Sequence, residues 1–480
     1  MKTEVKKLTI KQAAIGFVLS LVVLLSLVIL GVDLFLALFA TCIVTSIFGL
    51  AIGNKWEVIE EGLVEGGTSV LGATFVMIMV SVLVGVWMAS GTIPAILYYG
   101  LKLISPALFL PLTLVICIIT SVSTGTSWGT AGTIGIALFG VGVSLGIPAP
   151  MVVGAIVSGA IVGDKLSPLS DTTLLAAGTS GTKLFDHITS MLYTTVPIFL
   201  ISFVLYTIMG LKYGRESIDY SQINVFVDGL AANFKINPFM LIPVILVLAM
   251  SLKKIPAIPT FAIGIVFSMA WAVIFQDVSF SEICNIALNG YNANTGVSSL
   301  DGLLSRGGPK SMAVLTFTSL FCGVFTGILH KLGILSTLMG VITRKVRGSS
   351  SLVLTTLAAN FVIELGAGQY TVVTLPGAAF RETYDKYDVS SAVLSRSMED
   401  VGTMIDCVVP WQLAAIYYAG IFGVATLDYL PFTFLALLSI PVAVINAIFG
   451  IGIFHTKDPV KYNPFWRRSK HLENAMPTLE

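Results

Sequence analysis

Long hydrophobic runs separated by short polar breaks are the dominant pattern along the 480-residue chain. Several runs reach the roughly 20 residues with which a helix crosses the hydrocarbon core of a bilayer. Lipid offers no hydrogen-bond partners, so such runs fold as helices that pair their own backbone groups. The pattern predicts an all-α, polytopic membrane protein, with hydrophobic segments at 13–31, 34–53, 68–89, 95–104, 107–145, 150–180, 188–211, 238–252, 258–276, 311–330, 352–380 and 392–425.

The segments between these runs are mostly short. The stretches 54–66 and 279–290 read as amphipathic helices, and for 54–66 a helix lying in the membrane interface and an ordinary acidic loop helix are both open. Residues 212–237 read as a polar loop.

A polar cluster at 163–173 interrupts the hydrophobic pattern. From 67 to 163 there is no Asp or Glu, and Lys102 is the only Lys or Arg. Because Pro168 lacks an N–H and disfavours helical angles at Ser167, we expect the helix of 150–180 to break at this pair. A broken helix frees backbone groups at membrane depth, where transporters place ion sites.

The centre of 107–145 consists of small and hydroxylated residues around Trp128, including Thr126 and Ser127. Such a sequence favours a re-entrant turn whose hydroxyls face a cavity. The alternative is a tight crossing of two helices through small residues.

The second half repeats the order of elements of the first roughly 240 residues later, which indicates an internal structural repeat. Residues 352–380 correspond to 107–145, with Glu364 and Gln369 at the centre, and a second polar cluster at 395–406 corresponds to 163–173. Loop charge suggests the orientation, because basic loops stay in the cytoplasm. The basic run 344–347 is therefore expected on the cytoplasmic side. The matching segment of the first half, 102–106, has one lysine and is expected on the external side. The two halves are therefore expected to be inverted.

Lys2, Lys6, Lys7 and Lys11 predict a cytoplasmic N-terminus. The expected organisation is N-terminal helices at 1–53, a first repeat at 54–211 with a hairpin at 107–145 and a broken helix at 150–180, a connecting region at 212–278, a second repeat at 279–452 with a hairpin at 352–380 and a broken helix at 392–425, and a cytoplasmic tail at 453–480.

Composition narrows the class of function. Only 11% of the residues are charged, against roughly 25% in soluble proteins. The net charge of +1 and the lack of a basic patch argue against nucleic acid as a partner. We find no enzyme signature and no nucleotide-binding motif. Transport would then be driven by ion gradients, with a membrane potential worth about 2.3 kcal/mol per charge per 100 mV.

Six carboxylates lie at or near the predicted breaks: Asp164, Asp171, Glu364, Glu399, Asp400 and Asp406. Burying one at the bilayer centre costs about 2.5–3.5 kcal/mol, so such residues tend to be functional. Carboxylates, hydroxyls and freed carbonyls are ligands for sodium, and the same carboxylates are able to carry protons. The structural alternative is internal ion pairing, of Asp164 with Lys165 or of Glu399 and Asp400 with Arg396.

The chain resembles the NhaC family of sodium/proton antiporters, which includes relatives that exchange malate and lactate. The resemblance rests on GDKLSPLSDTT at 163–173, WMASGTIP at 87–94, GTSWGT at 125–130, LPG at 375–377, LSRSMED at 394–400 and PW at 410–411. It implies membership of the ion-transporter superfamily, with two inverted repeats and an elevator-type transport domain. It also implies a sodium site lined by Asp164, Ser167, Asp171 and Thr172. Leu174 and Gln412 replace asparagines expected in the family pattern, and residues 403–407 also depart from it. These departures leave open whether the chain is a plain sodium/proton exchanger or an exchanger of an organic solute.

The sequence therefore predicts a multi-pass protein of the cytoplasmic membrane that is not an enzyme, needs no cofactor, and exchanges sodium for protons by alternating access. The alternative is sodium- or proton-coupled exchange of a small organic acid or an amino acid, and a channel or sensor is a third reading. A homodimer is one possible assembly. The candidate ion- and substrate-binding residues are Thr126, Ser127, Asp164, Ser167, Asp171, Thr172, Gln369, Glu399, Asp400, Thr403 and Asp406.

Overall fold

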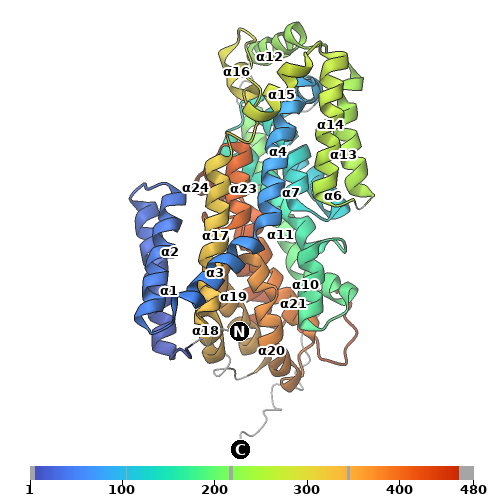
Figure 1. Cartoon of the computed structure of the whole chain (residues 1–480). Helices are drawn as coiled ribbons and strands as arrows, with labels where there is room; N and C mark the ends of the chain where they lie inside the picture. The colour runs from blue at the N-terminus through green and yellow to red at the C-terminus, as the bar shows by residue number, and fades with distance from the viewer. Residues whose placement is uncertain are drawn as a thin grey trace, which may run out of the picture.

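The computed structural model describes residues 6–103, 105–215, 220–253, 255–342, 346 and 348–463. Within these ranges the regular secondary structure is helical (Figure 1). Ten of the described helices are long and apolar enough to cross a membrane, or up to twelve if each of two sharply bent pairs counts as one span. The prediction of an all-α polytopic membrane protein is confirmed.

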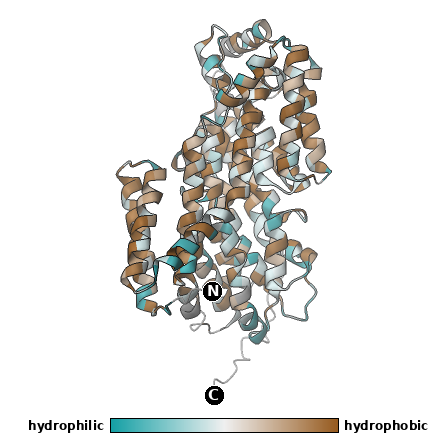
Figure 2. Ribbon diagram, in the orientation of Figure 1, coloured by the Kyte–Doolittle hydropathy of each residue, from teal (hydrophilic) through white to brown (hydrophobic). Residues whose placement is uncertain are grey.

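Two N-terminal helices, α1 (Ile10–Ile29) and α2 (Leu34–Ala51), stand as a pair at one side of the molecule (Figure 1). Asp33 separates them and caps α2, because its carboxylate accepts the N–H of Phe35 at 2.9 Å. Hydrophobic residues predominate on these helices and on the peripheral pair α13 (Ile242–Leu252) and α14 (Ala257–Phe275), as expected for surfaces that face lipid (Figure 2).

The predicted amphipathic stretch after α2 forms helix α3 (Trp56–Ser69), which packs against α17 (Ala313–Lys331). The backbones approach so closely that a β-carbon added at Gly66 would collide with the carbonyl of Gly323. Lys331 Nζ then pairs with Glu65 at 2.7 Å and with Glu61 at 3.0 Å. The acidic face of α3 is thus held by a helix of the second half of the chain.

The helices from α4 to α11 follow α3 along the chain and include the most deeply buried candidate spans of the described residues. They are α4 (Leu71–Ala89), α5 (Thr92–Leu103), α6 (Pro106–Thr124), α7 (Ser127–Thr130), a π-helical turn η1 (Ala131–Gly135), α8 (Ile136–Ser144), α9 (Ala149–Leu166), α10 (Asp171–Ser180) and α11 (Leu184–Arg215). In the stretch Ser127–Ser144, 83% of residues are buried, and in α9 78%, against 28% in α1 and in α14. The helices that carry the polar cluster of the first half are therefore among the innermost.

The connecting region contains more helix than expected. It holds α12 (Tyr220–Asn233), a 3₁₀ turn η2 (Pro238–Leu241), α13 and α14. α15 (Phe280–Asn289), at the predicted amphipathic stretch 279–290, and α16 (Ser298–Leu304) follow at the start of the expected second repeat. The reading of 212–237 as a polar loop is wrong for α12, because Leu230 and Val227 are buried there and α12 packs against α5. A helix of about this length is marginally stable alone and gains most of its stability from tertiary packing, which the sequence by itself does not show.

The remaining helices follow α17: α18 (Ile334–Ile342), α19 (Ser349–Val372), α20 (Leu375–Lys386), α21 (Ser391–Glu399), α22 (Gly402–Ile405), α23 (Leu413–Phe422), α24 (Thr426–Tyr429), a 3₁₀ turn η4 (Leu430–Phe432) and α25 (Phe434–Phe449). Three of the four residues of the basic run 344–347, Lys2, and residues 464–480 of the expected tail lie outside the described residues. The orientation that these charges predict stays a prediction.

Both predicted breaks are present. α9 ends at Leu166, Ser167 is extended, and α10 begins at Asp171. In the second half α21 ends at Glu399, and an irregular stretch after α22 leads into α23 at Leu413. The segment 107–145 is also interrupted, since Gly125 ends α6 with φ of +75° and Thr126 caps α7.

Candidate cation and substrate site

Asp164 lies in the last turn of α9 and binds the start of α7. One carboxylate oxygen accepts the backbone N–H of Ser127 at 2.8 Å, and the other accepts the Ser127 hydroxyl. Thr126 fixes this end of α7, because its hydroxyl accepts the N–H of Gly129 at 3.1 Å. The small and hydroxylated residues around Trp128 thus supply donors to a buried carboxylate.

The break after α9 is itself held by hydroxyls. Thr172 and Thr173 donate to the backbone carbonyl of Asp164 at 2.9 and 2.6 Å. Ser167 accepts the N–H of Leu169 at 3.2 Å. The hydroxyls of the motif therefore stabilise the interruption and keep the Asp164 carbonyl paired.

Asp171 begins α10 on the other side of the break and is exposed. One of its carboxylate oxygens accepts the hydroxyl of Tyr370 at 2.8 Å, and the other accepts the N–H of Thr172 at 3.0 Å. Tyr370 belongs to α19, so this contact joins the two halves of the chain at the site.

The second half contributes Asp406, which accepts the N–H of Ala414 at 2.9 Å. It lies beside a kink in α19, where Gly368 has φ of 66° and ψ of 177°. Gln412 donates to the backbone carbonyl of Glu364, and the thiol of Cys322 points to the Gln412 side-chain oxygen at 3.8 Å. Gln412 is not among the predicted site residues. The sequence had singled it out only because it replaces an asparagine expected from the family resemblance.

Two adjoining cavities connect these residues. One of about 320 Å³ is lined by Thr126, Trp128, Asp164 and Asp171, and one of about 340 Å³ by Cys322, Thr326, Asp406 and Gln412, among others. Both share Ser69, Gln369, Tyr370 and Leu413. No Lys, Arg or His lines either cavity within the described ranges. The polar lining is therefore acidic or neutral.

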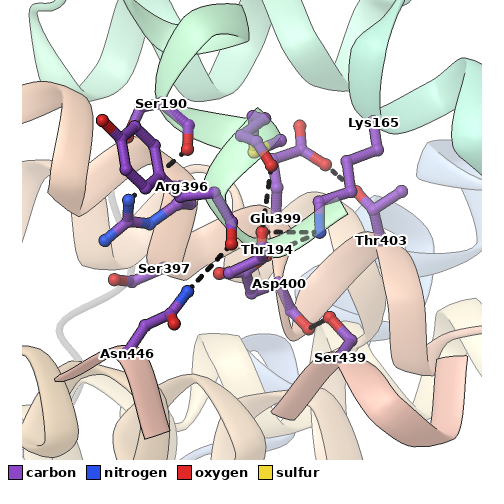
Figure 3. Close-up of polar contacts among 12 residues, drawn as sticks. Lys165, Ser190, Thr194, Arg396, Ser397, Glu399, Asp400, Thr403, Ser439 and Asn446 are labelled. Atoms are coloured by element: carbon purple, nitrogen blue, oxygen red, sulfur yellow. Dashed lines mark hydrogen bonds and ion pairs between the residues drawn. The ribbon is translucent and has the colours of Figure 1, made fainter. Parts of the chain in front are cut away.

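Six predicted residues are absent from the lining of both cavities. Ser127, Ser167 and Thr172 make the contacts described above, whereas Glu399, Asp400 and Thr403 lie close to Lys165 (Figure 3). Lys165 Nζ is 2.6 Å from Asp400 Oδ1, and both side chains are buried. The hydroxyl of Thr194 in α11 donates to the same carboxylate oxygen at 2.7 Å. Glu399 accepts the hydroxyl of Thr403.

The ion pairs proposed as a structural alternative do not form. Lys165 pairs with Asp400 and not with Asp164, because neighbouring helical residues point in different directions. Arg396 donates to the backbone carbonyls of Ser190 at 3.4 Å and Gly452 at 3.1 Å. In the part of the chain that the structure describes, neither Glu399 nor Asp400 forms an ion pair with Arg396.

No group of three or more His, Cys, Asp or Glu side chains among the described residues is placed to hold a metal ion. A cation at Asp164 and Asp171 would need hydroxyl, carbonyl or water oxygens to complete its shell. Such oxygen atoms are the ligands that hard cations prefer.

Known proteins resemble the chain over most of its length. The model of the Na⁺/H⁺ antiporter family matches residues 3–180 and 160–451. The chain is 38% identical to the malate-2H⁺/Na⁺-lactate antiporter of Bacillus subtilis, covering 90% of this chain and 92% of the relative. It is 34% identical to the Na⁺/H⁺ antiporter NhaC of Alkalihalophilus pseudofirmus, covering 92% and 97%. It is 36% identical to the arginine/ornithine antiporter ArcD of Halobacterium salinarum, covering 85% and 84%.

Proposed function

This chain belongs to the Na⁺/H⁺ antiporter family, and from this premise we propose that it exchanges sodium for protons at Asp164 and Asp171. The observation that carries the proposal is the position of Asp164: a buried carboxylate at a helix break that lines a cavity and is held by Ser127. A buried carboxylate of this kind binds either a cation or a proton, because leaving it charged and unpaired is costly.

The two occupants would compete. Sodium binds the ionised carboxylate, and a proton neutralises it, so each excludes the other from the same oxygen atoms. Ser127 supplies hydrogen bonds to Asp164, and Thr172 holds the carbonyl of the break in place. Competition for one site is sufficient for antiport when the empty, charged site does not cross the membrane.

The movement that we propose is of the elevator type, with two inverted repeats. The order of elements in the two halves supports the repeat, since each half has a kinked or interrupted segment followed by a broken helix. The deep burial of Ser127–Ser144 and α9, against the lipid-exposed α1 and α14, supports an inner transport domain and an outer scaffold. Lys6, Lys7 and Lys11 support a cytoplasmic N-terminus in the cell membrane.

A proteoliposome assay tests the exchange. Sodium added outside should collapse an imposed pH gradient in vesicles that contain the wild type, and Asp164→Asn should abolish this collapse. Asp33→Asn is the matched control, because asparagine also caps a helix and Asp33 lies at the exposed start of α2. Full exchange by Asp164→Asn would refute the assignment of the site.

A second candidate is exchange of a small organic solute. The cavities fall within the size range of small-molecule sites. Their lining lacks cationic side chains within the described ranges, which favours a solute with an ammonium group over a dicarboxylate. Counterflow of labelled ornithine, compared with labelled malate, would separate these cargoes, and counterflow of neither would leave sodium and protons as the cargo.

A further inference from the structure

Lys165 places an ammonium group between the ends of two broken helices. It lies in the last turn of α9, and its partner Asp400 directly follows α21. The Nζ atom lies 2.6 Å from Asp400 Oδ1 and 3.3 Å from Thr194 Oγ1, and neither charged side chain is more than 1% exposed. Figure 3 shows Lys165 reaching toward Asp400 and Thr194, with Glu399 and Thr403 beside them.

This is a favourable place for a cation. The C-terminal end of a helix carries partial negative charge, and Asp400 follows the last residue of α21. Transporters with broken helices use half-helix C-termini and freed carbonyls to hold their coupling cations. The position of Lys165 relative to α21 is therefore one in which a mobile cation would also be stable.

Two carboxyl groups, those of Asp400 and Glu399, lie close to the single ammonium of Lys165. Glu399 is fully buried, and one of its carboxylate oxygens has no hydrogen-bond partner among the described residues. Arg396 pairs with neither of these two carboxyl groups, since its guanidinium donates to the carbonyls of Ser190 and Gly452. Without Lys165, two carboxylates and a hydroxyl would remain in a dry interior, which is an oxygen-rich set suited to a hard cation.

We propose that the ammonium of Lys165 is a tethered substitute for a second transported cation. It fills the cation position of the second broken helix, so only the position at Asp164 and Asp171 exchanges its ion. This inference rests on the proposed function, because it takes sodium as the cargo of the first position. It gives Asp164 and Lys165, adjacent in sequence, different roles: Asp164 lines the cavity, and Lys165 is fixed to Asp400.

Equilibrium binding of ²²Na⁺ to purified protein at saturating sodium tests the proposal. Lys165→Met should bind one sodium ion more per protein molecule than the wild type, because sodium takes the vacated place beside Asp400. Lys165→Met/Asp400→Leu should return to the wild-type number, because the second position then lacks its carboxylate. Lys331→Met is the matched control: it also removes a paired lysine, but its partners Glu61 and Glu65 are partly exposed, and the number of bound ions should not change.

The outcomes are distinguishable. A folded Lys165→Met protein that binds the wild-type number of sodium ions overturns the proposal. If Lys165→Met unfolds without sodium, thermal stability is measured in sodium chloride and in choline chloride: rescue by sodium alone supports the proposal, and rescue by neither salt overturns it. A wild type that binds no ²²Na⁺ and shows no exchange would instead refute the proposed function.

Discussion

At the scale of single residues, Asp164 and Ser127 define the chemistry of the site. Ser127 offers both its N–H and its hydroxyl to the same carboxylate, so the ionised form of Asp164 has two fixed donors inside a hydrophobic protein. Hydrogen bonds to charged groups are worth more than those between neutral groups. The ionised form of Asp164 is therefore partly stabilised by Ser127 before any ion binds.

Ser127→Ala should weaken sodium binding, because in the proposed exchange the hydroxyl stabilises the ionised form of Asp164 that would bind sodium. A hydrogen bond to a charged group contributes about 1.5–3 kcal/mol, so the half-saturating sodium concentration should rise roughly 10-fold to 100-fold. Titration of the pH-gradient collapse with sodium measures this. Ser144→Ala is the control on the same helical stretch, since the Ser144 hydroxyl is buried and has no partner in the described part of the chain. Equal sodium dependence of both variants would contradict the assigned role of Ser127.

At the scale of elements, interruptions of helices place the polar groups. Pro168 ends one helix, and the threonine hydroxyls of α10 pair the freed carbonyl of Asp164. In the second half, Gly368 allows α19 to change direction beside Asp406 and Gln412. Backbone angles with φ of 66° and ψ of 177° are essentially restricted to glycine.

Gly368→Ala should destabilise the protein by about 1–3 kcal/mol, the cost of a side chain at such angles. It should also reduce exchange, because the new β-carbon would lie 2.7 Å from the Gln412 side-chain oxygen and displace that residue. Thermal unfolding in detergent and the vesicle assay measure the two effects.

The control for this change is Gly178→Ala in α10, where a β-carbon meets nothing within 4 Å. In a regular helix this substitution should be neutral or stabilise by up to about 1 kcal/mol. A Gly368→Ala protein as stable and active as Gly178→Ala would show that the kink has no role.

At the scale of the whole molecule, contacts between the two halves assemble the site. Tyr370 reaches Asp171, Lys165 reaches Asp400, and Trp128 stacks on Tyr417 with ring centroids 4.4 Å apart. The segment after α25 is tied back to the α20–α21 loop, since Ser390 N–H donates to the carbonyl of Phe454 at 2.9 Å. These long-range contacts join the two halves of the chain and hold the segment after α25 in place.

The same closing segment gives a pH dependence. The hydroxyl of Thr456 donates to Asp388 and holds the pKa of this carboxyl below its usual value, with His455 Nδ1 3.1 Å from the other oxygen. A lowered pKa stabilises the fold above the ordinary carboxyl pKa of about 3.9, and the contribution is lost as the pH falls through the folded-state pKa.

Asp388→Asn should therefore cost less than about 1 kcal/mol at pH 7, because contacts of exposed charged groups contribute little, and the difference from the wild type should vanish in acid. Melting temperatures between pH 7 and pH 3 measure this. Asp428→Asn, at an exposed aspartate of α24, should track the wild type throughout. A difference between Asp388→Asn and the wild type that persists in acid would contradict the account.

The sequence predicted the class of fold and most helix positions because hydrophobic length and Pro or Gly breaks are local signals. It also identified Asp164, Asp171 and Asp406 as groups at helix breaks, and these line the cavities. The sequence did not predict helix α12, which lies in the stretch read as a polar loop. The ion pair of Asp164 with Lys165, which the sequence left open, does not form. Pairing between residues separated by 235 positions depends on how the helices cross.

The chain by itself thus determined that the protein spans a membrane, that its helices break at 167–168 and after 399, and that carboxylates lie at those breaks, because lipid and backbone geometry act on neighbouring residues. Only the tertiary structure decided which carboxylates face the cavities and which are neutralised. Asp164 and Asp400 look alike in sequence, but one lines a cavity and the other is held by Lys165. The physical reason is that a buried charge is stabilised by whatever group packing brings within a few ångströms, and packing joins distant segments.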